Sequence, residues 1–358
     1  MLYSGIQSLQ MQYPALHVFD AITVRAVAAA ITALIVSLLI APGMISRMRA
    51  AQFSQPIRMD LPLSHAHKSN TPTMGGILIL VSVTFSVILW SDLHHAAVWL
   101  ALLVMLAFGS IGALDDYLKI RKSNTDGLSA RWKMILQSFF ALLTVSVMYF
   151  NGYADSAQLV LPFISSWMPH LGGWFILLGY FVLVGSSNAV NLTDGLDGLA
   201  IMPAVLVSLA LGVLAVVSSD IALAQAFSVP HVDVAELMVF CAALVGGGLG
   251  FLWFNAYPAQ IFMGDIGALG IGAALGVVAL SMHQEVLLFL MGGIFVAETV
   301  SVILQVMVFR LTGNRLFRMA PLHHHFELKG LPEPQIIVRF WVVTFVLVLI
   351  GLVSLQFR

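Results

Sequence analysis

The sequence predicts an all-α fold, a polytopic integral membrane protein with about ten transmembrane helices, and two observations carry this prediction. Of the 358 residues, 60% are hydrophobic and only 9% are charged, whereas a water-soluble globular domain contains about 25% charged residues. The charged residues also leave ten gaps that are long enough for a membrane-spanning helix, which needs about 20 apolar residues to cross the hydrocarbon core. We therefore expect a single transmembrane domain that comprises residues 1–358.

The ten expected spans follow one another along the whole chain. They are residues 26–46, 69–91, 93–114, 134–154, 156–193, 198–219, 237–264, 266–284, 286–309 and 340–357. Only the ninth contains a charge, Glu298, and Gln305 lies on the same helical face two turns later. A carboxylate within the membrane is either a functional group or a hydrogen-bonded packing group, and the sequence leaves both interpretations open. His283 and Glu285 lie at the turn between the eighth and ninth spans and are predicted to be solvated loop residues.

Basic residues predict the orientation, because Lys and Arg accumulate in cytoplasmic loops. Fourteen of the 16 Lys and Arg lie in residues 47–68, 119–133 and 310–339. The expected cytoplasmic loops are accordingly residues 47–73, 115–133, 191–198, 255–265 and 310–339. With an even number of spans, both termini are then expected on the periplasmic side. Cys241, the only cysteine, lies in the seventh span and excludes a disulfide within the chain.

The first cytoplasmic loop ends in Thr-Pro-Thr-Met-Gly-Gly at residues 71–76, shortly after Lys68. A turn with an approachable backbone at the start of a helix favours phosphate binding. A plain helix entry accounts for the same residues, and the sequence leaves both open.

The second loop is expected to open with two adjacent carboxylates, Asp115 and Asp116. Like charges side by side at the membrane boundary are costly unless a cation neutralises them. Mg²⁺ prefers carboxylate oxygens and often bridges to a phosphate. The alternative is the start of a solvated loop. Arg121, Lys122, Arg131 and Lys133, which follow, either set the orientation or meet anionic substrates and headgroups.

The third loop is the most polar stretch of an apolar chain, Asn-Ala-Val-Asn-Leu-Thr-Asp-Gly-Leu-Asp-Gly-Leu-Ala at residues 188–200. If it is helical, Asp194 and Asp197 lie on one face of a turn. If it is a loop, Gly195 and Gly198 let both carboxylates point at one ligand. An Asp-Gly turn between two helices is the simpler interpretation.

The fourth loop brings Asp265 to the head of the eighth span, where a helix N-terminus stabilises a carboxylate. Helix capping alone also accounts for an Asp there. Phe262 and Trp253 either stack on a base or sugar or anchor the chain at the membrane edge.

The fifth loop contains three consecutive histidines, His323, His324 and His325. Zinc is a weak candidate, because neither cysteine nor a helical His-x-x-x-His pair accompanies them. Histidines with a pKa near neutrality also bind phosphate or carry protons.

Five carboxylates on one rim, with Lys and His nearby, are the arrangement expected for metal-assisted phosphoryl transfer. A secondary transporter would place its charged site near the bilayer midplane, where only Glu298 is expected. A purely structural scaffold gives no reason for these acids to gather.

The same motifs resemble the polyprenyl-phosphate N-acetylhexosamine-1-phosphate transferase superfamily along the whole chain. The matching segments are residues 71–76, 115–117, 188–200, 255–265 and 320–330. The triple-histidine loop with its Glu-Leu-Lys-Gly tail resembles the muramoyl-pentapeptide branch in particular. A UDP-GlcNAc transferase acting on the same lipid is the alternative within the superfamily.

The resemblance implies Mg²⁺-dependent transfer of phospho-MurNAc-pentapeptide from UDP-MurNAc-pentapeptide to undecaprenyl phosphate, giving lipid I and UMP. It also implies a homodimer in the bacterial inner membrane, with an active site that faces the cytoplasm and no nucleic-acid partner. A direct attack by the lipid phosphate needs only positioning and the metal, and a single displacement is expected.

The resemblance also assigns roles to individual residues. Asp265 and Asp116 are the expected Mg²⁺ ligands, and Asp115, Lys133 and His324 complete the expected catalytic set. The expected substrate-binding residues are Lys68, Asn191, Asp194, Asp197, Asn255, Phe262, His323 and His325. The resemblance implies that Lys68 and Lys133 neutralise the pyrophosphate and that Asn255 and Phe262 lie near the nucleoside.

Overall fold

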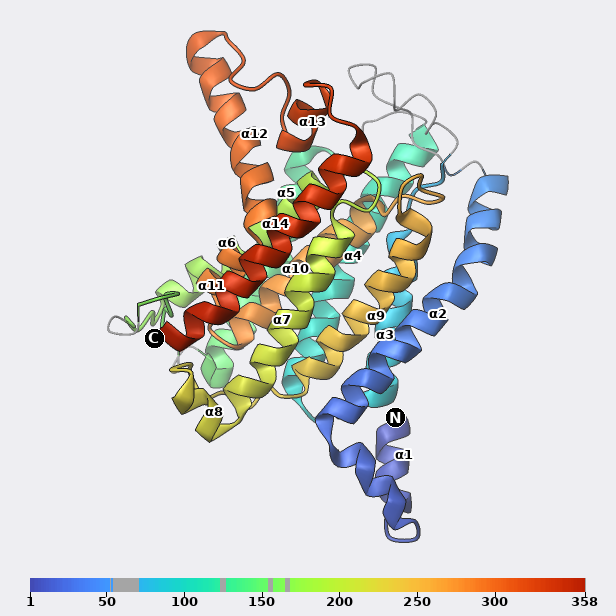
Figure 1. The fold of residues 1–358 in the computed structure, drawn as a ribbon, viewed down its shortest axis with the longest axis vertical. Helices are drawn as coiled ribbons and strands as arrows, with labels where there is room; N and C mark the ends of the chain where they lie inside the picture. Colours follow the sequence, from blue (N-terminus) through green and yellow to red (C-terminus); the bar gives the residue numbers. More distant parts are fainter. Residues whose placement is uncertain (52, 54–70, 123–126, 154–156, 165–167, 358) are drawn as a thin grey trace.

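The structure, a computed structural model, describes residues 1–51, 53, 71–122, 127–153, 157–164 and 168–357, and it is a bundle of long helices (Figure 1). These residues form no β-strand and only isolated bridges, such as those between Gln158 and His170 and between Leu161 and Ile164. The prediction of an all-α fold is therefore confirmed.

The described elements, in chain order, are α1 (Leu2–Leu9), η1 (Pro14–Asp20), α2 (Ile22–Ala50), α3 (Gly76–Trp90), α4 (Ala96–Lys122), α5 (Ala130–Met148), η3 (Tyr149–Tyr153), α6 (Trp174–Thr193), α7 (Ile201–Ser219), α8 (Ile221–Ala226), α9 (Leu237–Asn255), α10 (Gly264–Ser281), α11 (Glu285–Met291), α12 (Gly293–Thr312), α13 (Leu322–Glu327), α14 (Glu333–Ser354) and η4 (Leu355–Phe357).

Nine helices of the described part of the chain are long and apolar enough to cross a membrane. They are α2, α4, α5 together with η3, α6, α7, α9, α10, α12 and α14. The second expected span corresponds to α3, an apolar helix of 15 residues. The protein is accordingly a multi-pass membrane protein, and each expected span overlaps an apolar helix. The fifth expected span, 156–193, is helical only from Trp174, since the described residues before it form turns and isolated bridges.

Helix α10 lies at the centre of the bundle and packs against α3, α4, α6 and α7 (Figure 1). All its residues from Ile266 to Ser281 are buried. Small residues make this possible: a Cβ at Gly272 would lie 2.4 Å from the carbonyl oxygen of Ser186. Small residues at such crossings let helix backbones approach closely in a membrane, where dispersion contacts hold helices together.

Helix α4 continues beyond its first charged residue, so the prediction of a loop at residues 115–133 is wrong for residues 115–122. Helix α4 continues to Lys122, so Asp115 and Asp116 are helical and buried. Lys119 pairs with both of them from the following turn, and cations near a helix C-terminus are favourable. A helix can therefore extend past its apolar segment when its charges are paired and covered.

The ninth expected span consists of two helices, α11 and α12, which are separated at Gly292. The break lies before Glu298, which is buried within α12. Beyond the break, α12 diverges from the bundle (Figure 1). Helix α14 begins at Glu333, so the last part of the expected loop 310–339 is also helical.

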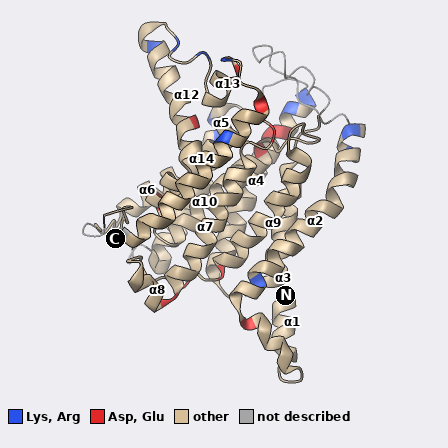
Figure 2. Cartoon of the chain, viewed as in Figure 1, with Lys and Arg blue, Asp and Glu red and all other residues tan. Residues whose placement is uncertain are grey.

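Lys and Arg gather at one end of the bundle, which we call the basic end; Arg47 and Arg49 mark it at the last turn of α2 (Figure 2). Arg25, in the first turn of α2, is an exception at the opposite end. It forms a buried two-point ion pair with Glu236, with nitrogen–oxygen distances of 2.6 and 2.8 Å. The charge distribution agrees with the expected asymmetry, and the direction of the bundle across a membrane stays a prediction.

The turn between α10 and α11 is buried, which corrects the prediction that His283 and Glu285 are solvated. Their exposed fractions are 0% and 4%. The ring of Phe175, at the start of α6, lies 6.2 Å from the His283 ring and covers it. Burial raises the pKa of Glu285 to about 8 and lowers the pKa of His283 to about 4.

We predict that Glu285→Gln flattens the dependence of stability on pH. Because the folded-state pKa of Glu285 is raised from 4.5 to about 8, the folded protein binds a proton that the unfolded chain releases. This contribution to stability is present below about pH 4.5 and is lost as the pH rises through about 8. The check is the unfolding temperature in detergent between about pH 5 and pH 9. The exposed Asp233→Asn variant is the control, and equal slopes in wild type and Glu285→Gln would contradict the prediction.

Candidate active site

Three carboxylates meet where the last turns of α4 approach the first turn of α10. Asp115 and Asp116 are 3% and 0% exposed, and the side chain of Asp265 is 14% exposed. Each residue offers one carboxylate oxygen, and these oxygens all lie within 4.8 Å of one another. The structure thus brings together the acids that the sequence separates by about 150 positions.

Backbone groups hold these carboxylates in place. The amide of Ile266, in the first turn of α10, donates to Asp116 Oδ2 at 3.2 Å, and the amide of Leu128 donates to Asp115 Oδ1 at 2.6 Å. Gly264 has a φ of +72°, and a Cβ there would lie 2.4 Å from Asp116 Oδ2. Glycine is therefore required where the chain enters α10 beside the acids.

Residues 71–76 position this entry through main-chain hydrogen bonds. The amides of Gly75 and Gly76 donate to the carbonyls of Phe262 and Met263, each at 2.8 Å, and the amide of Phe262 donates to the Pro72 carbonyl at 2.8 Å. These glycine amides are consequently engaged by the protein itself. The helix-entry interpretation of this motif is favoured over a phosphate loop.

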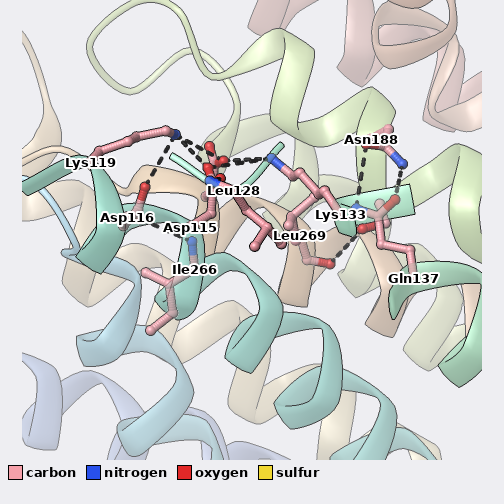
Figure 3. A network of polar contacts seen from close by, with 11 residues as sticks. Asp115, Asp116, Lys119, Leu128, Lys133, Gln137, Asn188, Ile266 and Leu269 are labelled. Carbon is pink, nitrogen blue, oxygen red and sulfur yellow. Dashed lines mark hydrogen bonds and ion pairs between the residues drawn. The ribbon is translucent and has the colours of Figure 1, made fainter. Parts of the chain in front are cut away.

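Two lysines neutralise the acid cluster (Figure 3). Lys119 Nζ lies 2.6 Å from Asp115 Oδ2, 3.0 Å from Asp265 Oδ2 and 3.6 Å from Asp116 Oδ1. Lys133 Nζ lies 2.5 Å from Asp265 Oδ2 and 3.7 Å from Asp115 Oδ2. Lys133 was expected in the site, whereas Lys119 was predicted only as an orienting charge. Its spacing of three and four residues from the acids on one helix was the signal that could have identified it.

The donor set suits a divalent cation. Hard cations such as Mg²⁺ take carboxylate oxygens and keep part of their water shell, and the three clustered carboxylates present such oxygens close together. Asp116 and Asp265, the expected metal ligands, both belong to this cluster.

Asp194 and Asp197 have different surroundings, although both lie in the turn between α6 and α7. Burial raises the pKa of Asp194 well above its usual range, and the nearby carboxylates of Asp265 and Asp116 raise it further. Asp194 therefore borders the acid cluster. Asp197 Oδ2 instead accepts a hydrogen bond from the amide of Ala259 at 2.9 Å.

Several expected substrate-binding residues support neighbouring loops. Asn255 accepts from the amide of Gly198 at 3.0 Å and donates to the carbonyl of Ile261 at 2.8 Å. Its amide group thus joins the third loop to the fourth. Asn191 and Phe262 are partly exposed. Lys68 lies outside the described residues.

The three histidines point to three different partners. His323 is 1% exposed and its Nδ1 lies 3.2 Å from Glu298 Oε2. His324 Nδ1 lies 2.7 Å from Glu327 Oε2. His325 Nδ1 accepts from the amide of Arg318 at 3.1 Å. Among the described residues, these histidines belong to no group of three metal-ligating side chains.

Glu298 connects the histidine helix α13 to α12 and to the polar third loop. Its Oε1 accepts from the backbone amide of His323 at 3.1 Å. On the other side of the His323 ring, a Cβ on Gly195 would lie 2.2 Å from Nε2. Of the two interpretations left open for Glu298, the structure supports a hydrogen-bonded packing group that positions His323.

Two further residues hold the site, and the sequence analysis did not select either one. Glu333, in the first turn of α14, accepts from the amide of Asp197 at 3.0 Å. Trp341, on the same helix, donates to the carbonyl of Gly198 at 3.1 Å. Neither residue stands in a polar motif, so only the packing of α14 against the turn reveals them.

Comparison with known families gives two matches. The family described as glycosyl transferase family 4 matches residues 97–283, a range that holds the three clustered carboxylates and both lysines. The phospho-N-acetylmuramoyl-pentapeptide-transferase signature 1 matches residues 68–80. That signature covers the segment whose backbone fixes the entry to α10.

We predict that Gly264→Ala lowers the free energy of unfolding by about 1 to 3 kcal/mol, because alanine is strained at positive φ and its Cβ would collide with Asp116. The measurement is denaturant unfolding in detergent, together with Mn²⁺ binding followed by electron paramagnetic resonance. Gly43→Ala is the matched control, since no atom lies within 4 Å of a Cβ there. Unchanged stability and unchanged Mn²⁺ affinity in Gly264→Ala would refute the required glycine.

Proposed function

The chain belongs to glycosyl transferase family 4, and from this membership we propose that it transfers phospho-MurNAc-pentapeptide from UDP-MurNAc-pentapeptide to undecaprenyl phosphate, giving lipid I and UMP. The family match supports phosphosugar transfer to a polyprenyl phosphate in general. The observation that carries the muramoyl substrate is the signature at residues 68–80.

The proposed reaction is one in-line displacement. A phosphate oxygen of undecaprenyl phosphate attacks the β-phosphorus of the nucleotide sugar. The bond from that phosphorus to the bridging oxygen breaks, and UMP leaves with this oxygen. Because both substrates carry negative charge, positioning and charge neutralisation account for most of the catalysis expected in such a transfer.

The acid cluster and its lysines are suited to this task. Asp115, Asp116 and Asp265 would hold Mg²⁺, which supplies neutralisation of phosphate oxygens when it is bound. Lys133 lies on α5, whereas the three acids lie on α4 and α10. Its ammonium group is the proposed cation for the pyrophosphate. The turn that contains Asp194 lies beside the cluster and is the proposed site of the uridine-diphosphate part.

The surrounding residues would exclude water and fix the substrates. Glu298 and Glu333 hold α13 and the third loop in place, so the proposed sugar-facing role of the histidines depends on these buried carboxylates. His324, held by Glu327, is the proposed member of this group at the phosphates.

The proposed setting is the bacterial inner membrane, with the basic end in the cytoplasm. The concentration of Lys and Arg at that end supports this orientation. A soluble nucleotide and a lipid phosphate could then reach the acid cluster from the same side. A homodimer is part of the proposal by family resemblance.

We predict that the purified protein releases UMP when Mg²⁺, undecaprenyl phosphate and UDP-MurNAc-pentapeptide are present together. Omission of the lipid phosphate should stop the release, because the lipid provides the nucleophile. UDP-GlcNAc with the same lipid is the comparison substrate. UMP from UDP-GlcNAc but not from the muramoyl nucleotide would move the protein to the GlcNAc-1-phosphate branch.

We also predict that Asp265→Asn lowers the rate of UMP release by about a hundredfold or more, because a site built for transition-state charge loses a charged group. Mn²⁺ affinity should fall as well, while circular dichroism stays unchanged. Asp233→Asn, on the exposed side of the opposite end, should retain the wild-type rate. A wild-type rate in Asp265→Asn would remove the metal role from this residue.

A further inference from the structure

Lys119 contacts every carboxylate that would hold the metal. Its Nζ lies 2.6 Å from Asp115, 3.0 Å from Asp265 and 3.6 Å from Asp116. Lys133 shares only two of these partners, and the longer of its two contacts is 3.7 Å. Of the two ammonium groups, that of Lys119 therefore contacts more of the clustered carboxylates.

A divalent ion added to this cluster beside both ammonium groups would be repelled by them. Three carboxylates and two lysines carry one net negative charge, and a divalent ion would turn it into one net positive charge. Like charges a few ångströms apart repel each other strongly in a partly buried site. Lys119 contacts one oxygen of each of these carboxylates, so the ammonium and the ion compete for the same three groups.

The position of Lys119 lets it leave the cluster without a change in the helix. It lies in the last turns of α4, and its side chain is 17% exposed. A lysine side chain is a mobile point charge on a flexible stem. Solvent or an anionic substrate phosphate at the mouth of the site could receive the displaced ammonium.

We propose that Lys119 is an exchangeable counter-ion: it holds the three carboxylates together in the metal-free protein, and divalent metal displaces it. The proposal rests on the metal site of the proposed function and assigns Lys119 a positioning role. Lys119 thus stabilises the metal-free site and weakens metal binding.

Displacement of Lys119 would also couple metal binding to nucleotide binding. The ammonium that the metal displaces needs a new anionic partner, and a diphosphate offers one. UDP should therefore strengthen metal binding to the wild-type protein more than to a protein that lacks the Lys119 charge.

The test uses Lys119→Met, which removes the charge and keeps most of the stem. Full-length protein is purified in detergent, treated with a chelator and titrated with Mn²⁺ under electron paramagnetic resonance, without substrate. The variant should bind Mn²⁺ about tenfold more tightly than wild type, because the competing charge is gone. Its unfolding temperature in chelator should be lower than that of wild type, and Mn²⁺ should raise it more.

The matched control is Arg121→Met, which makes the same change in charge at an exposed position two residues along α4. It should leave Mn²⁺ affinity and stability in chelator close to wild type. If Lys119→Met does not fold without metal, Lys119→Gln replaces it with the same expected results. The UDP titration is run on wild type and on the folded variant.

Mn²⁺ affinity that is unchanged or weaker in the folded Lys119 variant would overturn the proposal. An equal gain in Arg121→Met would do the same, because the effect would then come from net charge. UMP release by the wild-type protein is measured in parallel, so that failure of the counter-ion proposal is distinguished from failure of the transferase function.

Discussion

The structure depends on the neutralisation of three carboxylates that are buried together at one end of a membrane bundle. Carboxylates so close together repel one another, and burial removes the water that would screen them. Two ammonium groups and two backbone amides supply the compensation in the described structure. Gly264 follows from the same demand, because the start of α10 must come close to Asp116 for acids on α4 and α10 to share a cation.

The helical fold could be predicted from the sequence because a bilayer imposes a minimum apolar length on each span. Gaps between charged residues therefore locate the helices well. These gaps do not locate the ends of the helices, because a charged residue ends a span only if it must be solvated by water. Asp115 and Asp116 are paired within the protein, and α4 continues past them. Glu285 and His283 lie at a turn that is buried, in part by Phe175 of α6. No local sequence pattern predicts that a distant helix covers a turn.

The candidate site was predictable as a set of polar residues and less so as a set of contacts. Asp116 and Asp265 were expected to approach each other, and their oxygens do lie together. The sequence did not reveal that Asp194 borders the acid cluster whereas Asp197 accepts a hydrogen bond from Ala259. This difference depends on which segment packs against each carboxylate. The role of Glu298 could be recognised only from its hydrogen bond to His323, and the position of His323 depends on the docking of a six-residue helix. Such information resides in packing between distant segments.

The main-chain pairing of residues 72–76 with residues 262–263 joins the start of one helix to the start of another that is distant in sequence. The pairing lies at the rim of the bundle, while the buried length of α10 holds the helices together. Residues 72–76 are buried, and so are Ile261 and Met263, so this pairing is packed into the protein. A change at the start of α3 would therefore be transmitted through main-chain hydrogen bonds to the entry of α10, where the amide of Ile266 holds Asp116.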